Sequence, residues 1–312
     1  MAMTPPEPTA RVVCIGHATL DAILAVPRLP VSDERLPASA GALAGGGPAA
    51  TAAVALARLG IAVAFGGRIG DDPAGQVIRD GLLAEGVDVS ALEAVPGSSP
   101  FTAVLVDPDG GRALVPAPGD LPPIRLTPAL ESLLGSAAWV HLDHVGAALL
   151  PAIRALACPA RVSVDGGNPI EGLVLGGVDL YAPTVTALLA RVDAPDLDEA
   201  LEAGLREGAA LVVATDGARG SHAAWRDAAG HVRRATVPAP PVVGLVSTLG
   251  AGDVFHGALL AALVEGREVE DALAFANRVA AASTRALDGR TAIPRREELD
   301  VPADRRDLGA PR

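Results

Sequence analysis

A glycine-rich turn that leads into an apolar segment constrains this chain more than any other feature. The turn is Gly250-Ala251-Gly252, and the alanine- and leucine-rich residues up to Leu260 predict a helix. The first N–H groups of a helix have no partner within it, and they lie at the positive end of the helix dipole. Glycine also lets a ligand approach the backbone closely. The stretch therefore predicts a helix start that binds an anion such as phosphate.

Asp253 follows this turn and falls in the first turn of the predicted helix. A carboxylate at that place can simply stabilise the helix end. It can also act as the base that takes a proton from a hydroxyl group while the hydroxyl attacks a phosphoryl group. For an isolated Gly-x-Gly-Asp sequence the structural role is the more common one, so the residues alone leave both roles open.

The absence of lysine excludes two kinds of active site. All 25 residues counted as Lys or Arg are arginines, so a Walker-type phosphate loop and Schiff-base chemistry on lysine are both excluded. Phosphate can then be bound by backbone amides, a metal ion or arginine. Hydrophobic residues make up 50% of the chain but aromatic residues only 2%, so a core of Ala, Val and Leu is expected.

The net charge and the cysteines indicate the partners and the cellular compartment to expect. A formal charge of −12 repels nucleic acid, which is therefore not expected as a partner. Cys14 and Cys158 lie far apart in the sequence, which fits a reducing cytoplasm and no disulfide framework. We find no signal segment and no apolar run long enough to span a membrane, so a cytoplasmic protein without membrane contact is expected.

Apolar runs alternate with helical segments along most of the chain. Buried strands are predicted over 11–16, 61–69, 139–144, 161–165 and 210–215. Strands that alternate with helices imply an α/β fold, with a doubly wound and mostly parallel sheet and helices on both faces. Such sheets bind ligands at the carboxyl ends of their strands. Asp21, soon after the first strand, can simply form a turn, or it can bind hydroxyl groups, because a carboxylate accepts two hydrogen bonds.

Polar residues also end the strand over 139–144. His141, Asp143 and His144 could suggest a metal ion, but no third group of ligands accompanies them, so we predict no metal site built from side chains. His141 is expected to be structural, and Asp143 or His144 to reach the substrate.

A small second sheet is predicted beside the main one. The residues Val106 to Gly111 predict a hairpin turn between strands over 101–106 and 112–115, and 22–44 contains further short strands. We therefore divide the chain into an α/β core (11–21, 45–97 and 118–297), a β lid (22–44 and 98–117) and loose ends (1–10 and 298–312).

Seven residues of the C-terminal stretch match the pattern D-T-x-G-A-G-D-x-F-x-G: Thr248, Gly250, Ala251, Gly252, Asp253, Phe255 and Gly257. This stretch resembles the signature of the ribokinase-like (PfkB) carbohydrate kinases. Residues 45–60, with the sequence Gly-Gly-Pro-Ala-Ala-Thr, resemble the N-terminal signature of that family, and the likeness covers roughly 11–295. The sequences of 45–53 and 252–259 are most similar to those of the sulfofructose kinase branch.

The resemblance implies a role for each matching residue. It makes Asp253 the catalytic base and the Gly250, Ala251 and Gly252 amides the anion hole. The residues assigned to the substrate are Asp21, Gly45, Gly46, Thr51, Arg35, Phe101 and Asp143. Those assigned to the nucleotide are Thr215, Gly217, Arg219, Gly220, Thr248 and Asn277. It also implies ATP with Mg²⁺, a lid over the sugar, and a homodimer formed through that lid.

The chain departs from the family pattern at three places. Ser247 replaces an aspartate near the phosphates, so stimulation by a monovalent cation is in doubt. Thr184 and Ala187 replace the polar residues of an Asn-x-x-Glu element linked to the magnesium water shell. Thr51 replaces a substrate-binding asparagine.

The function predicted is ATP-dependent phosphorylation of a primary hydroxyl of a sugar or a sugar-like compound. A nucleoside kinase is the alternative, but Phe101 is the only aromatic residue predicted in the lid, and a base needs aromatic residues on which to stack. A sugar-binding protein on a kinase scaffold is the second alternative. Retention of Asp253 argues against it, because a binding protein needs no base.

Overall fold

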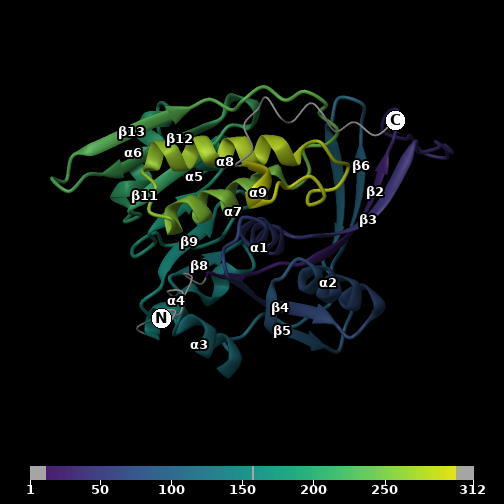
Figure 1. Cartoon of the computed structure of the whole chain (residues 1–312), viewed down its shortest axis with the longest axis horizontal. Coiled ribbons are helices and arrows are strands. Elements are labelled where there is room, and N and C mark those ends of the chain that lie inside the picture. Colours follow the sequence, from purple (N-terminus) through teal and green to yellow (C-terminus); the bar gives the residue numbers. More distant parts are fainter. Residues whose placement is uncertain (1–11, 157, 300–312) are drawn as a thin grey trace, which may run out of the picture.

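Nine described strands form the main sheet, in the order β13-β12-β11-β10-β9-β8-β1-β4-β5. The computed structural model describes residues 12–156 and 158–299 (Figure 1). The strands are β1 (Val12–Ile15), β4 (Val63–Gly70), β5 (Asp88–Val95), β8 (Trp139–Leu142), β9 (Arg161–Asp165), β10 (Leu180–Ala182), β11 (Leu211–Thr215), β12 (Ser221–Arg226) and β13 (Val232–Val237). Pairing is parallel from β11 to β5, and β12 and β13 add an antiparallel edge that was not predicted.

Helices cover both faces of this sheet, which confirms the predicted α/β architecture (Figure 1). One face carries α1 (Pro48–Arg58), α2 (Pro73–Ala84), α7 (Ala251–Val264) and α8 (Val269–Ser283). The other carries α3 (Pro128–Leu134), α4 (Leu150–Ala155), α5 (Val185–Arg191) and α6 (Leu197–Arg206). Successive side chains of a strand point to opposite faces. In β1, Val12 and Cys14 accordingly pack with the first group of helices, and Val13 and Ile15 pack with the second.

Small residues let α1 and α7 pack closely. Alanine contributes most of the buried residues of α1, and Gly257 of α7 faces it. A Cβ at Gly257 would lie 2.5 Å from the carbonyl oxygen of Ala52, so no larger residue fits there without moving a helix. The small residues therefore let the middle of α7 pack directly against the backbone of α1.

Four strands form a second sheet, in the order β3-β2-β6-β7. They are β2 (Thr19–Ala25), β3 (Ala40–Gly46), β6 (Phe101–Val106) and β7 (Arg112–Ala117), and the predicted hairpin joins β6 to β7. This sheet stands at one end of the main sheet (Figure 1). Because β2 begins at Thr19 and β3 ends at Gly46, Asp21, Gly45 and Gly46 all belong to the second sheet, and Asp21 does not lie in a turn.

The predicted loose ends fall mostly outside the residues that the structure describes. Residues 1–10 and 300–312, which we predicted to be loose, lie outside the described residues. The last described element is α9 (Arg296–Leu299), so 298 and 299 are helical where a loose end was predicted. Two short 3₁₀ helices, η1 (Gly146–Leu149) and η2 (Gly217–Arg219), follow strands of the main sheet. Among the helices of residues 12–156 and 158–299, none is both long and apolar enough to cross a membrane.

Candidate active site

The start of α7 has the geometry that its glycines predict. Gly250 adopts the left-handed conformation, with φ of 70°, and a Cβ there would lie 3.1 Å from the Cα of Gly289. Gly252 is exposed, and no atom lies within 4 Å of the place where its Cβ would stand. The first turn of α7 therefore faces open space with its N–H groups at the positive end of a 14-residue helix.

Asp253 lies in that first turn and is half-buried. Burial, followed by the negative charge of Asp165, raises its pKa to about 7, against the opposing effects of His256 and Arg112. A carboxylate with a pKa near neutrality is suited to accept a proton and later to release it. The position and the electrostatics both suit the predicted base.

A buried charged cluster lies beneath Asp253. His256, one turn further along α7, places Nδ1 3.0 Å from Oδ2 of Asp165 at the end of β9. Burial alone would lower the pKa of His256, but the charge of Asp165 raises it above its usual value. The same pair lowers the pKa of Asp165 despite its burial. The charges of Asp165 and Asp253 therefore favour the protonated form of His256, a relationship that the sequence did not indicate.

His141 completes this cluster. Its Nδ1 lies 3.0 Å from Oγ of Ser163, and its Nε2 is buried without a hydrogen-bond partner among the described residues. His141, Asp165 and His256 each bring one ligand-type atom within 4.8 Å of the other two. The sequence grouped His141 with Asp143 and His144, whereas the structure groups it with residues from β9 and α7. Burial lowers the pKa of His141 to about 3, so its ring is neutral.

Asp143 has a structural role that the prediction of substrate binding missed. It is fully buried, and its Oδ1 accepts hydrogen bonds from the N–H groups of Val145 and Gly146 at 2.8 and 2.9 Å. Its Oδ2 accepts from His17 at 2.7 Å and from Ala49 at 3.2 Å. Both oxygens are thus occupied by backbone groups, because the turn after β8, the turn after β1 and the start of α1 all converge on this carboxylate.

Asp21 faces the end of β3 from within the second sheet. A Cβ on Gly46 would lie 2.1 Å from Oδ2 of Asp21, so only glycine fits beside it. The carboxylate accepts a hydrogen bond from Thr19, and Oγ1 of Thr19 lies 3.4 Å from Oγ1 of Thr102. Burial raises the pKa of Asp21, and the hydrogen bond from Thr19 and the charge of Arg290 oppose that rise.

Phe101 lies on the opposite face of the sheet from Asp21, contrary to its predicted role at the substrate. The register pairs Asp21 with Thr102 and Leu20 with Phe101, and directly paired residues share one face. The side chain that accompanies Asp21 is therefore Thr102. A one-residue error in a strand moves a side chain to the other face, and the sequence of β6 alone does not fix that register.

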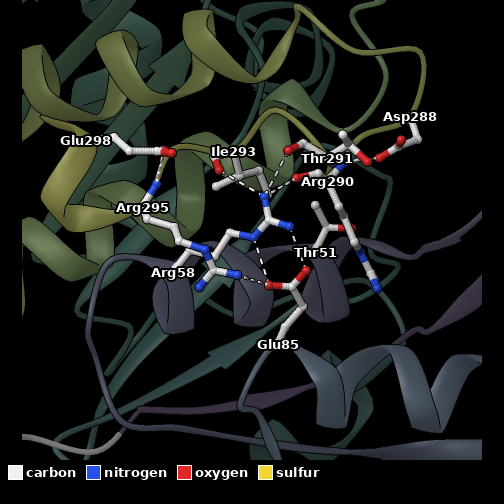
Figure 2. Close-up of polar contacts among 9 residues, drawn as sticks. All are labelled: Thr51, Arg58, Glu85, Asp288, Arg290, Thr291, Ile293, Arg295 and Glu298. Atoms are coloured by element: carbon white, nitrogen blue, oxygen red, sulfur yellow. Dashed lines mark hydrogen bonds and ion pairs between the residues drawn. The ribbon is translucent and has the colours of Figure 1, made fainter. Parts of the chain in front are cut away.

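Thr51, Gly45 and Gly46 share a neighbour that the sequence did not indicate. Arg290, from the loop after α8, donates from Nε to Oγ1 of Thr51 at 3.2 Å and from Nη2 to the carbonyl oxygen of Gly46 at 2.8 Å. A Cβ on Gly45 would lie 2.3 Å from Nη1 of Arg290. The loop is fastened in turn by Arg58, which lies between Glu85 and the loop carbonyls (Figure 2).

The loop after β11 holds most of the predicted nucleotide residues. Thr215 ends β11, and η2 contains Gly217 and Arg219. Arg219 is largely exposed and forms a bidentate pair with Asp216 at 2.6 Å, so its charge is already balanced within the loop. Gly220 is required by the fold, because its φ is 105° and a Cβ would lie 2.1 Å from the carbonyl oxygen of Val237.

Thr248 and Asn277 make contacts within the protein. The hydroxyl of Thr248 accepts from Arg112 at 2.7 Å and donates to the carbonyl of Gly110 at 3.1 Å, which ties the β6–β7 hairpin to the anion-hole turn. Asn277 is buried and donates to Ser221 at 3.1 Å and to the carbonyl of Val237 at 2.9 Å, so both of its N–H groups fasten α8 to the antiparallel edge.

Two of the residues that depart from the family pattern are uncharged and form hydrogen bonds with backbone N–H groups. Ser247 is buried, and its Oγ accepts from the N–H of Leu249 at 3.1 Å. Thr184 caps α5 by accepting from the N–H of Ala187 at 3.0 Å. Arg35 is exposed in the connection between β2 and β3. The buried arginine beside the predicted substrate residues is Arg290.

A cavity of about 490 Å³ lies along one face of α8. Its lining includes Pro240, Val242, Arg278, Ala282 and Arg285. It lies between the segment that follows β13 and the helix whose face we expected to border a nucleotide base, and its size suits such a ligand.

The chain is similar to known proteins over most of its length. The model of the PfkB family carbohydrate kinases matches residues 9–164 and 168–296. The chain is 28% identical to the ribokinase of Bacillus subtilis over 298 residues, covering 93% of this chain and 98% of that protein. It is 30% identical to the ATP-dependent ribose-1-phosphate kinase of Halopiger xanaduensis over 275 residues, covering 86% and 89%.

A solved structure agrees at the level of the fold. The structure of Arabidopsis thaliana ribokinase complexed with ribose and ATP matches with a TM-score of 0.78 at 24% identity, covering 93% of this chain and 97% of that one. The family model covers most of the chain, including the anion-hole turn and Asp253. The chain belongs to the PfkB family of carbohydrate kinases.

Proposed function

We propose that this protein transfers the γ-phosphoryl group of ATP to a primary hydroxyl of a sugar or a sugar-like compound. The observation that carries the proposal is the pairing of two features on one helical turn. Asp253, with its pKa raised to about 7, stands next to an open helix start at Gly250 to Gly252. A base and an anion site this close together suit the attack of a hydroxyl on a phosphate.

The proposed reaction assigns one task to each group. Asp253 takes the proton of the substrate hydroxyl as its oxygen bonds to the γ-phosphorus, and the bond from that phosphorus to the β–γ bridging oxygen breaks to release ADP. The N–H groups at the start of α7 bind the negative charge that spreads over the transferring group. The protonated form of His256, which Asp165 favours, lowers the pKa of Asp253, while burial and the charge of Asp165 raise it.

The chain's own residues fit ATP better than they fit a metal ion. Gly252 has open space before it, as an approaching phosphate requires. Ser247 and Thr184 are neutral and already engaged in hydrogen bonds with backbone N–H groups, so neither offers a carboxylate to a cation. Mg²⁺ would therefore arrive bound to the phosphates of ATP, where it neutralises charge. We assign the cavity along α8 to the base of the nucleotide.

A sugar is favoured over a nucleoside as the acceptor. In the described strands of the second sheet, the residues that share the face of Asp21 include Thr102 and Val104, and no aromatic ring stands among them. A nucleoside base would lack a stacking partner on that face. The similarity of 45–53 and 252–259 to sulfofructose kinases makes a sulfonated sugar the second candidate.

We also propose that two copies of the chain pair through the outer face of the second sheet. Leu43 and Val115 are 70% and 65% exposed and lie in one row of that face, across Ala22 and Ala103. Exposed apolar rows of this kind mark interaction surfaces. Analytical ultracentrifugation of the wild type and Leu43→Asp tests this assignment: a dimer that the substitution converts to monomer is expected, and a wild-type monomer at micromolar concentration contradicts it.

The function is tested by measuring ADP release from ATP and Mg²⁺ with a panel of sugars and nucleosides. We expect turnover with one or more sugars, and its loss in Asp253→Asn. Binding of a sugar by calorimetry without any turnover would instead indicate a binding protein on the kinase scaffold. Turnover with nucleosides alone would favour the alternative acceptor.

A further inference from the structure

Arg290 reaches the predicted sugar site from a distant part of the sequence. Its side chain runs away from the loop that carries it and passes Thr51 (Figure 2). It contacts Thr51 and Gly46 by hydrogen bonds and lies against Gly45, so it touches three of the seven positions predicted to bind the substrate. Only 8% of the residue is exposed.

One end of this guanidinium remains available. Nε and Nη2 are used by Thr51 and Gly46, whereas Nη1 makes no hydrogen bond to any residue that the structure describes. Nη1 is not fully enclosed either, since it is absent from the buried atoms that lack a partner. A buried arginine with unused N–H groups carries a desolvation cost unless a ligand satisfies them.

The loop is built to hold Arg290 in place. Nη1 of Arg58 donates to the carbonyls of Arg290, Thr291 and Ile293 at 2.6, 3.1 and 2.9 Å (Figure 2). The other side of Arg58 is fixed by a bidentate pair with Glu85 at 2.6 and 2.8 Å. Asp288 accepts from the N–H groups of Arg290 and Thr291. Such preorganisation lowers the entropy lost when a ligand binds.

We infer that Arg290 is a substrate-binding residue, whose Nη1 donates a hydrogen bond to an oxygen of the sugar in the place of the amide that Thr51 lacks. The inference rests on the proposed function, which locates the sugar beside Asp21, Gly45 and Gly46. Asp21 accepts hydrogen bonds and Arg290 only donates them. Two neighbouring hydroxyls of a sugar satisfy both, one donating to the carboxylate and the other accepting from the guanidinium.

The charges at this site select a neutral ligand. The charges of Asp21 and Asp253 both act on Arg290 and oppose the lowering of its pKa by burial. Asp21 offsets the positive charge of Arg290, so the site offers no net positive charge to a carboxylate, sulfonate or phosphate group at this end of the substrate. We therefore assign a neutral vicinal diol to the site, which disfavours a sulfonate group there.

The first test compares Arg290→Met with the wild type for binding of the sugar that gives the best turnover. A charge-assisted hydrogen bond is lost, so sugar affinity and the KM for the sugar should weaken about 10- to 100-fold, while the KM for ATP stays within about twofold. Arg295→Met is the matched control. It removes a half-exposed arginine of the same region, which pairs with Glu85 as Arg58 does. Sugar affinity unchanged within twofold in folded Arg290→Met overturns the inference.

A second test remains decisive if Arg290→Met is unstable. Arg290→Lys keeps the charge but not the planar set of donors. Monodeoxy analogues of the sugar are then measured against both proteins. One deoxy position should cost the wild type at least about tenfold and cost Arg290→Lys much less, because the contact is already gone. Equal penalties at every position in the two proteins refute the contact.

Arg58 is a positioning residue in this arrangement, and its test is coupling. Arg58→Met should weaken sugar binding in the wild-type background but add little in the Arg290→Met background. Fully additive effects would indicate a merely structural role.

A separate binding experiment tests the assignment of a neutral ligand to this site. D-Ribose and D-fructose are compared with D-gluconate and D-ribonate, which carry a carboxylate at the end away from the primary hydroxyl, by calorimetry without ATP, so the result does not depend on turnover. Tighter binding of the neutral sugars supports the assignment. Tighter binding of the anionic compounds overturns it, and leaves the proposed kinase activity to be judged on the turnover panel alone.

Discussion

His256 and Asp253 stand one helical turn apart at the start of α7, and the pKa of each is set partly by the charge of the other. Asp165, which lies 3.0 Å from His256, favours the protonated form of that ring near the carboxylate that we assign as the base. The pair acts on the base in two opposite ways, because Asp165 raises the pKa of Asp253 and His256 lowers it.

Replacement of the base should abolish most of the turnover and little else. Asp253→Asn removes the proton acceptor but keeps the size of the side chain, so kcat should fall about 10²- to 10⁴-fold. ATP affinity, measured by calorimetry, should stay close to that of the wild type. Activity within a factor of a few of the wild type would exclude Asp253 as the base.

The pH dependence follows from the raised pKa of the same residue. A base works only when it is ionised, so kcat should rise with pH through the pKa of about 7 and then level off. The measurement is kcat at saturating ATP and sugar, from about two units below this pKa to two units above it. The residual activity of Asp253→Asn serves as the control and should lack this rise. A flat wild-type profile would be inconsistent with the assignment.

The buried ion pair should contribute to stability. The pKa of Asp165 is lowered and that of His256 is raised, so the pair stabilises the fold between these two values. This contribution is lost as pH falls through the pKa of Asp165 or rises through that of His256. Asp165→Asn should lower the free energy of unfolding by at most about 3–5 kcal/mol, because buried His256 then either stays charged without this partner or loses its proton. Urea unfolding provides the measurement.

Asp253→Asn is the contrasting variant in that experiment. Burial raises the pKa of Asp253, so its ionised form costs the folded state free energy as pH increases. Its replacement by a neutral side chain should leave the free energy of unfolding unchanged or higher. Equal destabilisation by both substitutions would contradict the electrostatic account of this cluster.

Removal of the Asp21 carboxylate from the second sheet should weaken binding of the sugar but not binding of the nucleotide. Asp21→Ala deletes the acceptor beside Gly46, so we expect sugar binding to weaken by about tenfold or more while nucleotide binding is retained. Calorimetric titration with each ligand separately distinguishes the two effects. Unchanged sugar affinity would show that the sugar lies elsewhere.

Potassium should stimulate the enzyme weakly or not at all. The side chain of Ser247 is neutral and buried, and it is engaged with the N–H of Leu249, so it offers a cation no negative charge. Turnover is compared in potassium and in a bulky organic cation at equal ionic strength, with Mg²⁺ constant. A many-fold response of the wild type to potassium would refute this inference, and a response created by Ser247→Asp would support it.

Local patterns in the sequence were sufficient to predict the parallel part of the main sheet and its helices, but not the antiparallel edge formed by β12 and β13. The apolar run that ends at Gly16 and the segment that ends at Thr215 became β1 and β11, because buried parallel strands are continuously apolar. The start of α7 could also be predicted, since its glycines and the acid that follows are contiguous. In each case the determining residues are neighbours in the sequence.

Relationships between distant segments could not be predicted. Arg290 bonds to Thr51 across 239 positions, and an arginine in a polar loop gives no local sign of such a contact. Asp143 looked like a substrate ligand at the end of a strand, but the backbone of three segments uses both of its oxygens. Phe101 was assigned to the wrong face because the register of β6 depends on its pairing with β2.

Thr248 links the second sheet to the start of α7. Its hydroxyl joins Arg112 and Gly110 of the second sheet to the turn that opens α7. Movement of that sheet away from the core must therefore break these hydrogen bonds or displace the phosphate-binding turn. We expect the turn to take its productive shape only while the sheet is closed over an acceptor. Water entering an open enzyme would then meet an incomplete phosphate site, and futile ATP hydrolysis would be suppressed.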